Sequence, residues 1–279
     1  MADLLLRERR GRARYRSLAP DDPRAPAGDA HPASGQARPA SATRPPIGEA
    51  QLAQAYAAQD ALVAELRAHG GETVGFKVGL TVPRMQAFCG VSQPVAGCVL
   101  ARTVFKSPAE IAVERFVHVG VESELCLLLA EDLPARPQPY ARAEVAAALG
   151  AAAAAFELVD DRSADYAQLE AFTLVADNAW NAGAVLGAAR PAAALPLGAL
   201  GATLSVNGAI VDRGNSADAL GDPLVVLAWL ASHLARRGRG LRAGEFVLTG
   251  SLVPTRFARA GERYRFELEG LAPVELSVR

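Results

Sequence analysis

The chain has 279 residues, 51% of them apolar and 21% charged, with a net charge of −1; these proportions are typical of a globular protein of enzyme size and give no sign of nucleic-acid binding. Its three cysteines include no Cys-x-x-Cys pair, which argues against a disulfide framework and against a zinc knuckle. Because no apolar run approaches the roughly 20 residues that span a bilayer, and no signal segment is recognisable, we expect a cytoplasmic protein without a membrane partner.

Residues 1–46 differ in composition from the rest of the chain. They hold seven prolines and no sustained apolar period, and residues 1–48 carry nine arginines against five acidic residues. Such a segment buries too little apolar surface to fold alone, so we predict a disordered or weakly packed tail rich in Arg, Pro and Ala. A short basic helix in MADLLLRERRGRARYRSL is the alternative for its first part. Residues 47–279 are predicted to form a single folded domain.

The folded part begins with a predicted helix that is followed by a strand. In IGEAQLAQAYAAQDALVAELRAHGG the apolar residues recur at helical spacing, and the pair Gly70-Gly71 ends the helix. The next segment, TVGFKVGLT, predicts a strand over 73–80. Further along, the alanine-rich segment VAAALGAAAAAFELVDDR, residues 145–162, predicts an apolar helix that runs into Glu157.

The C-terminal half adds a hairpin, a helix and closing strands. Asn207-Gly208 in ATLSVNGAIVD is a good two-residue turn between alternating apolar residues. Asp222 and Pro223 supply an N-cap and a first-turn proline for a helix over PLVVLAWLASHLARR, and EFVLTGS and RYRFELEGLAPVELSV supply strands. Strands outnumber helices without a regular βαβ alternation, which favours an α+β fold with a large mixed or antiparallel sheet.

The segment HVGVESELCLLLAEDLP, residues 118–134, carries two carboxylates inside an otherwise apolar run. Glu122 and Glu124 are two residues apart, so in a strand both point to the same face. Burying unpaired carboxylates is costly, and that face therefore meets either water or a cation. Two such carboxylates can hold Mg²⁺ or Mn²⁺ through oxygen, with Glu157, a lone acid in AAAAAFELV, as a candidate third ligand. The alternative is a solvated strand face and an unrelated Glu157.

Lys77 is the candidate for a cationic partner. It lies in GFKVGLT, an apolar strand with glycines on either side, so its ammonium group can pair with an anionic substrate. The alternative is a side chain that extends to the surface. The four histidines have no metal-ligand spacing, and no nucleophile elbow, P-loop or dinucleotide-binding glycine motif is present.

Two further segments place polar groups beside apolar runs. In LVADNAWNAG, Asp177, Asn178 and Asn181 follow three apolar residues, and the alternative to a site is an Asx turn after a strand. In FVLTGS, Thr249, Gly250 and Ser251 offer hydroxyl and backbone N–H groups at the end of a strand. Such a group of donors suits a carboxylate, although it also suits an ordinary turn.

Seven segments, taken in their order along the chain, resemble the 2-oxopent-4-enoate hydratase and 4-oxalocrotonate decarboxylase group of the fumarylacetoacetate hydrolase superfamily. They are VGFKVGLT, VSQPVAG, VESELCLLLAEDLP, FELVDDR, VADNAWNAG, GDPLVVLAWLA and FVLTGS. The resemblance covers residues 47–279 and implies a mixed β-roll with flanking helices. It implies that Glu122, Glu124 and Glu157 hold Mg²⁺ or Mn²⁺ and that Lys77 is the active-site lysine.

The same resemblance assigns the remaining candidates to substrate binding. Thr249, with the neighbouring Gly250 and Ser251, would face the substrate carboxylate, and Asp177 and Asn178 belong to a motif of the same group. The domain would then be catalytic, with a 2-oxo acid as its small-molecule partner, no nucleic-acid partner, and a homo-oligomeric assembly.

The function that the resemblance implies is a metal-dependent lyase of aromatic-compound catabolism. The leading interpretation is a hydratase that adds water to a 2-hydroxydienoate or 2-oxo-enoate and gives a 4-hydroxy-2-oxo acid. The alternative is a 2-oxo-3-enedioate (4-oxalocrotonate) decarboxylase, followed by a C–C hydrolase or an oxaloacetate-type decarboxylase. From a different class, the chain could be a catalytically inactive, metal-free paralogue that acts as a binding or structural protein.

Three positions depart from the pattern of the group. Val95 stands where the hydratases carry an acid in a P-D-[FY]-G turn, and this change favours the decarboxylase alternative. Gly120 replaces a basic residue two places before the first glutamate, so one anchor for an anionic substrate is missing. Trp180 stands where a small residue is common. The metal ligands are unaffected, and the exact reaction is left open.

Overall fold

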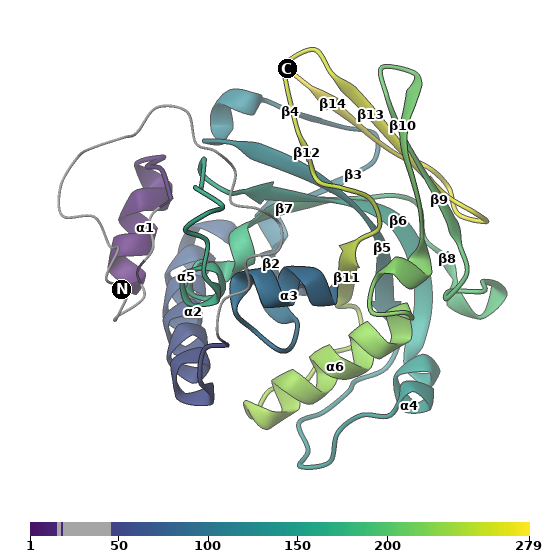
Figure 1. Cartoon of the computed structure of the whole chain (residues 1–279). Coiled ribbons are helices and arrows are strands. Elements are labelled where there is room, and N and C mark those ends of the chain that lie inside the picture. Colours follow the sequence, from purple (N-terminus) through teal and green to yellow (C-terminus); the bar gives the residue numbers. More distant parts are fainter. Residues whose placement is uncertain (16–17, 19–45) are drawn as a thin grey trace.

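The computed structural model of the chain describes residues 1–15, 18 and 46–279. In these residues two mixed β-sheets pack together and six α-helices lie around them (Figure 1). The helices are α1 (Ala2–Arg10), α2 (Glu49–Gly70), α3 (Pro83–Cys89), α4 (Arg142–Ala147), α5 (Ala171–Ala176) and α6 (Pro223–Arg236). The α+β fold with mixed sheets and flanking helices is confirmed.

The larger sheet has nine strands and the smaller has five. The larger contains, in spatial order, β2 (Val95–Leu100), β1 (Thr73–Gly79), β11 (Phe246–Ser251), β5 (Val119–Leu129), β6 (Leu149–Asp160), β7 (Asn181–Leu186) and β3 (Val104–Lys106), with β12 (Arg256–Phe257) beside β5 and β8 (Arg190–Pro191) beside β6. The smaller contains β10 (Ala209–Asn215), β9 (Gly201–Val206), β13 (Arg263–Leu268), β14 (Val274–Val278) and β4 (Ala109–Ile111). Most neighbours are antiparallel, but β1 and β11 run parallel.

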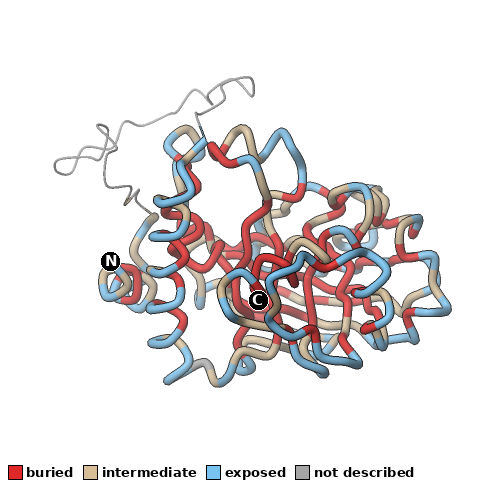
Figure 2. The backbone as a smooth tube through the Cα atoms, turned by 90° about the horizontal axis from the view of Figure 1, so that it is seen from below, coloured by how far each residue is buried: buried red, intermediate tan, exposed pale blue. Residues whose placement is uncertain are grey.

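The core between the sheets is built on one face of β6. Phe156 is fully buried there, with its ring centroid 6.3 Å from Tyr264 and 6.1 Å from Phe266, both on β13 of the smaller sheet. Since successive side chains of a strand point to opposite faces, Glu157 points away from this core. Figure 2 shows that buried residues are concentrated in the interior of the molecule. The larger sheet thus has one face in the core and leaves the other for a site.

Several predicted elements are confirmed. Helix α2 ends at Gly70, and β1 covers Thr73–Gly79. The Asn207-Gly208 turn joins β9 to β10, and both residues have positive φ, as a two-residue hairpin turn with right-handed strand twist requires. Asp222 caps α6, since its Oδ1 accepts a hydrogen bond from Leu224 N at 2.8 Å.

The prediction of a helix over 145–162 is wrong for most of its length, since only its first residues, 145–147, are helical, as the end of α4. Residues 149–160 form strand β6, which pairs antiparallel with β5 on one side and β7 on the other. A run of alanines has high intrinsic helix propensity, but the buried position between two long strands outweighs it. Strand β5 pairs with β6 at eleven positions, with one register shift between Leu128 and Leu129, and the small alanine side chains leave room for the neighbouring layers.

Residues 1–15 do not form the loose tail that the sequence predicts. Helix α1 packs against α2, and Leu5 and Leu6 are buried in a small cluster with Leu62 and Ala176 (Figure 1). These two leucines were too short an apolar run to indicate docking. Residues 16–17 and 19–45 of the predicted tail lie outside the described residues.

Candidate active site and metal centre

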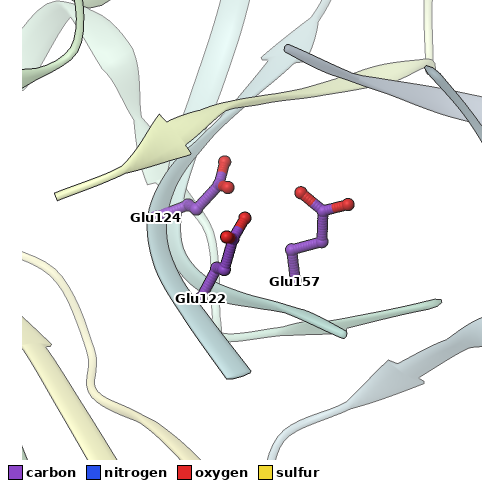
Figure 3. Close-up of side chains that lie close together, drawn as sticks. All are labelled: Glu122, Glu124 and Glu157. Atoms are coloured by element: carbon purple, nitrogen blue, oxygen red, sulfur yellow. The ribbon is translucent and has the colours of Figure 1, made fainter. Parts of the chain in front are cut away.

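Three glutamates converge on the face of the larger sheet that is not in the core. Glu122 and Glu124 project from the same face of β5, and Glu157 lies directly opposite Glu122 in the β5–β6 pair. One carboxylate oxygen from each residue lies within 4.8 Å of the others. Figure 3 shows the three carboxylates pointing into one space from the two neighbouring strands. The grouping has the charge and donor type that a hard divalent cation takes.

Each carboxylate is oriented by a hydrogen bond from a different element. Gly250 N donates to Glu124 Oε2 at 2.7 Å, Asn181 Nδ2 to Glu157 Oε1 at 2.9 Å, and Thr255 Oγ1 to Glu122 Oε1 at 2.7 Å. Among the residues that the structure describes, the buried Glu124 Oε1 has no hydrogen-bond partner. A buried carboxylate oxygen without a donor is costly, and a bound cation would compensate it.

The electrostatics of the cluster also favour a cation. Burial raises the pKa of Glu124 well above its ordinary value, and the charges of Glu157 and Glu122 raise it further. Burial likewise raises the pKa of Glu157 to about 7, although Lys77 opposes the shift. In the protein without metal, these carboxyls therefore resist ionisation, because the fold holds them close together and away from water.

Lys77 completes the cluster from β1. Its Nζ lies 3.3 Å from Glu157 Oε2, and only 4% of the residue is exposed. Burial by itself lowers the pKa of Lys77, but the charges of Glu157, Glu122 and Glu124 outweigh burial, and the pKa is raised. The side chain is therefore an interior ammonium group, and the surface alternative is excluded for this structure.

A cavity of about 470 Å³ opens beside the cluster. Lys77 and Glu122 line one part of it, together with Gly250 and Ser251 from the end of β11. The volume falls within the roughly 300–1,000 Å³ of small-molecule sites. The structure thus brings Glu122, the lysine and two of the predicted substrate-binding residues to one cavity, and the other two metal candidates lie beside Glu122.

The structure places the other three predicted substrate-binding residues away from this cavity. The Thr249 hydroxyl donates to Leu125 O at 2.9 Å inside the sheet. Asn178 exchanges hydrogen bonds with the backbone of Cys98, and the fully buried Asp177 pairs with two arginines. The segment before Asp177 is helix α5 rather than the expected strand. These side chains support the wall of the site from behind.

Those two arginines are Arg9 of α1 and Arg162, which follows β6. Arg9 Nε lies 2.7 Å from Asp177 Oδ1, and its other nitrogens donate to Asp177 O and Asn181 O. Arg162 also pairs with Glu8 at 3.9 Å. The N-terminal helix is therefore linked to the turn that carries Asn178, Ala179 and Trp180, all three with positive φ. A left-handed backbone at three consecutive non-glycine residues is strained, and these links hold it in place.

Four residues of the site carried no assigned role in the sequence. Asn181 and Thr255 orient metal candidates, and Tyr166 and Asp218 line the cavity. Asn181 belongs to the polar segment ADNAWNAG, but nothing in that segment indicates that its side chain binds a glutamate. Thr255, Tyr166 and Asp218 lie in loops or short helices whose sequence carries no recognisable pattern.

The three positions that depart from the family pattern, Val95, Gly120 and Trp180, all lie at the cavity or behind its wall. Val95 is buried and lines it, so this position supplies no acid. Gly120 lies behind its wall, where an added Cβ would come 2.8 Å from Thr255 Cγ2 and 2.9 Å from Val159 Cγ2. Those neighbours fill the space that a longer side chain would need. Trp180 lines the cavity, with its ring centroid 5.5 Å from that of Tyr15 and 6.0 Å from that of Tyr166.

Comparison with known proteins identifies the family. Residues 80–279 match the fumarylacetoacetate (FAA) hydrolase C-terminal family, and the chain belongs to it. The chain is 40% identical over 235 residues to a 2-keto-4-pentenoate hydratase of Paraburkholderia phymatum, covering 83% of this chain and 87% of the relative. It is 32% identical over 219 residues to a 4-oxalocrotonate decarboxylase of a Pseudomonas species, covering 78% and 84%.

The structural comparison agrees with the sequence comparison. The 4-oxalocrotonate decarboxylase of Pseudomonas putida G7, solved with magnesium and adipate, superposes with a TM-score of 0.77 at 26% identity, covering 84% of this chain and 91% of that one. The homologues named as hydratase and decarboxylase indicate an enzyme of the lyase type. In the part of the chain that the structure describes, no helix is long and apolar enough to cross a membrane.

Proposed function

We propose that the protein is a metal-dependent hydratase of 2-hydroxydienoates, giving 4-hydroxy-2-oxo acids in aromatic-compound catabolism. The observation that carries the proposal is the buried group of Glu122, Glu124 and Glu157 with Lys77 at the end of a cavity. The 40% identity to a hydratase supports this reaction over the others of the family.

Glu122, Glu124 and Glu157 would hold Mg²⁺ or Mn²⁺. The unpaired Glu124 Oε1 and the raised pKa values of Glu124 and Glu157 fit this assignment, since both costs are relieved beside a dication. When bound, the metal supplies a Lewis acid for the carboxylate and 2-oxygen of the substrate. Asn181, Thr255 and the Gly250 amide would keep the ligands in place.

Lys77 would stabilise negative charge on the substrate. In the metal-free fold the charges of the neighbouring glutamates raise the pKa of Lys77, so its ammonium group would donate to an anionic oxygen of the substrate. In the reaction a proton leaves the 2-hydroxyl and another is added at C5, which gives a conjugated enone. Water then adds, with its hydroxyl at C4 and a proton at C3. The buried ammonium group lies where it can stabilise the oxygen that becomes anionic between these steps.

The proposal is tested with 2-hydroxypenta-2,4-dienoate by following the loss of its ultraviolet absorbance with Mg²⁺ and with EDTA. We expect turnover with Mg²⁺ and none with EDTA. Glu124→Gln keeps the shape but removes a charge, so it should abolish turnover and weaken the metal-dependent rise in melting temperature. The proposal is refuted if Mg²⁺ does not raise the melting temperature of the wild-type protein and its activity in EDTA equals that in Mg²⁺. That result would support the metal-free paralogue.

Decarboxylation of a 2-oxo-3-enedioate is the second candidate. Val95 favours it, because the cavity lacks an acid at that position for proton transfer to carbon. Release of CO₂ from 2-oxohex-3-enedioate, measured beside the hydration assay, distinguishes the two reactions.

We also propose a cytoplasmic homo-oligomer. All three cysteines are free and buried, as is usual in a reducing compartment. We also keep the prediction that the protein binds neither nucleic acid nor a membrane. Light scattering of the purified protein gives the assembly.

A further inference from the structure

The cavity has two chemically different parts. Lys77 and Glu122 mark the end beside the metal candidates. The rest is lined mainly by apolar side chains from the start of α3 and the residue before it, the loop after β6, helix α5 and the turn after it, and the loop after β11, namely Val82, Met85, Tyr166, Leu169, Leu174, Trp180, Leu252, Val253 and Pro254. We call this second part the distal chamber.

The whole cavity is larger than a five-carbon substrate needs. 2-Oxopent-4-enoate has eight non-hydrogen atoms and occupies at most about 240 Å³, taking about 30 Å³ per water-sized group as an upper guide. The cavity of about 470 Å³ is about twice as large. A substrate whose carboxylate and 2-oxygen lie at the metal end therefore leaves the distal chamber unfilled unless C5 carries a substituent.

Within the described part of the chain, no residue gives the chamber a positive charge that could pair with a second carboxylate. Among the described residues that line the cavity, Lys77 is the only cation, and it is taken by Glu157 at the metal end. The remaining acid, Asp218, would repel an anion. The space beside Gly120 is filled by Val159 and Thr255, so no side chain enters from there. A distal carboxylate would lose hydration without gaining a partner.

The rim of the chamber exposes apolar surface. Val82, Met85 and Tyr166 all line the cavity and are 41%, 37% and 39% exposed. Exposed apolar side chains gathered at one cavity indicate that an apolar ligand covers them. Trp180 and Tyr166, inclined at 71° with centroids 6.0 Å apart, offer aromatic surface to such a ligand.

From these observations we infer that the substrate carries an uncharged, apolar substituent of about alkyl-chain or phenyl size on its distal carbon, and that the distal chamber binds it. The inference rests on the proposed function for the reaction, but its ligand preference is set by the chamber alone. Residues Met85, Tyr166 and Trp180 would determine specificity.

Binding tests the preference without chemistry. Calorimetry in Mg²⁺ compares 2-oxohexanoate with 2-oxoadipate, which has the same chain length but ends in a carboxylate, and with 5-phenyl-2-oxopentanoate. We expect 2-oxohexanoate to bind at least about tenfold more tightly than 2-oxoadipate, and the phenyl compound more tightly still. Equal or tighter binding of 2-oxoadipate would overturn the inference.

Met85→Lys supplies the missing charge at an exposed position where folding is not at risk. We expect it to raise the affinity for 2-oxoadipate by about tenfold and lower that for the phenyl compound. Ile210→Lys, at an exposed apolar residue outside the cavity, is the matched control and should change neither. An unchanged preference in Met85→Lys would contradict the chamber assignment.

Turnover separates this inference from the proposed function. If 5-alkyl or 5-phenyl 2-hydroxydienoates are hydrated with a kcat/KM about tenfold or more above that of the five-carbon parent, both hold. If the parent is hydrated and the longer compounds are not better, the inference fails and the function stands. If no dienoate is hydrated but the binding preference is as expected, the function fails and the chamber assignment stands.

Discussion

At the scale of single residues, the carboxyl groups of Glu124 and Glu157 couple metal binding to pH. In the metal-free fold their pKa values are raised above the ordinary 4.5, that of Glu157 to about 7, so the folded protein keeps protons that the unfolded chain releases. The stability of the metal-free protein should therefore fall as pH rises from about 4.5 to about 7.

Metal binding should show the opposite trend. A dication binds the ionised carboxylates and displaces their protons, so its affinity increases through the same pH range. We expect the melting-temperature increase produced by Mg²⁺ to be larger at about pH 8 than at about pH 5.5. Scanning calorimetry at both pH values measures it, and an increase independent of pH would contradict the assignment of Glu124 and Glu157 as ligands.

The two lysines of the chain provide a matched pair of variants. Lys77→Met removes the buried ammonium group and should lower kcat/KM by about two decades or more while the fold persists. Lys106→Met removes a lysine on the exposed side of β3 and should leave the kinetics unchanged. Steady-state assays compare the two, and wild-type kinetics for Lys77→Met would leave the lysine without a catalytic role.

At the scale of elements, the close approach of β2 to the turn after α5 supports the wall of the cavity. An added Cβ at Gly97 would come 2.7 Å from Asn178 O and 3.1 Å from Lys77 Cγ. Gly97→Ala must therefore displace the turn or the lysine, and overpacking of this kind costs about 1–3 kcal/mol. We expect a melting temperature lower by several degrees and a reduced kcat.

The control for that variant is Gly198→Ala. The nearest atom to its added Cβ is Asp222 Cγ at 3.9 Å, an ordinary contact. Its melting temperature should stay within about one degree of the wild type. A Gly97→Ala protein as stable and active as this control would show that the wall tolerates displacement.

The elements also show which parts of the site the sequence could predict. The common face of Glu122 and Glu124 followed from their spacing in a strand. Glu157 was chosen as third ligand, but on a predicted helix, because five consecutive alanines favour a helix when their neighbours are unknown. Only the pairing of β5 with β6 places Glu157 opposite Glu122.

Long-range contacts account for the remaining differences. Asp177 and Asn178 were expected to bind substrate, and their polarity serves instead to fix a buried turn. The sequence of a turn does not show which side chains face the cavity and which face the protein. The orienting donors Asn181 and Thr255 depend likewise on strand register that no local pattern encodes.

At the scale of the whole molecule, the N-terminal helix is part of the folded body. Leu5 is fully buried, and Arg9 is bonded to Asp177 behind the cavity. Removing residues 1–15 should therefore lower the melting temperature, and Leu5→Ala alone should cost about 2–5 kcal/mol. Thermal unfolding checks both, with Arg7→Ala on the exposed side of α1 as the control. A truncated protein with unchanged melting temperature would show that α1 contributes nothing.

Strand β11 lies between β1 and β5 in the larger sheet, although it comes from the last fifth of the chain. On the ribosome, β1 and β5 are complete long before β11 emerges, so each keeps an open edge that can pair with other nascent chains. Folding must end with the insertion of a central strand, and sheets closed by such distant pairings form slowly. Glu124 also receives its Gly250 donor only at that step. Demand for chaperones should therefore be greatest just before termination.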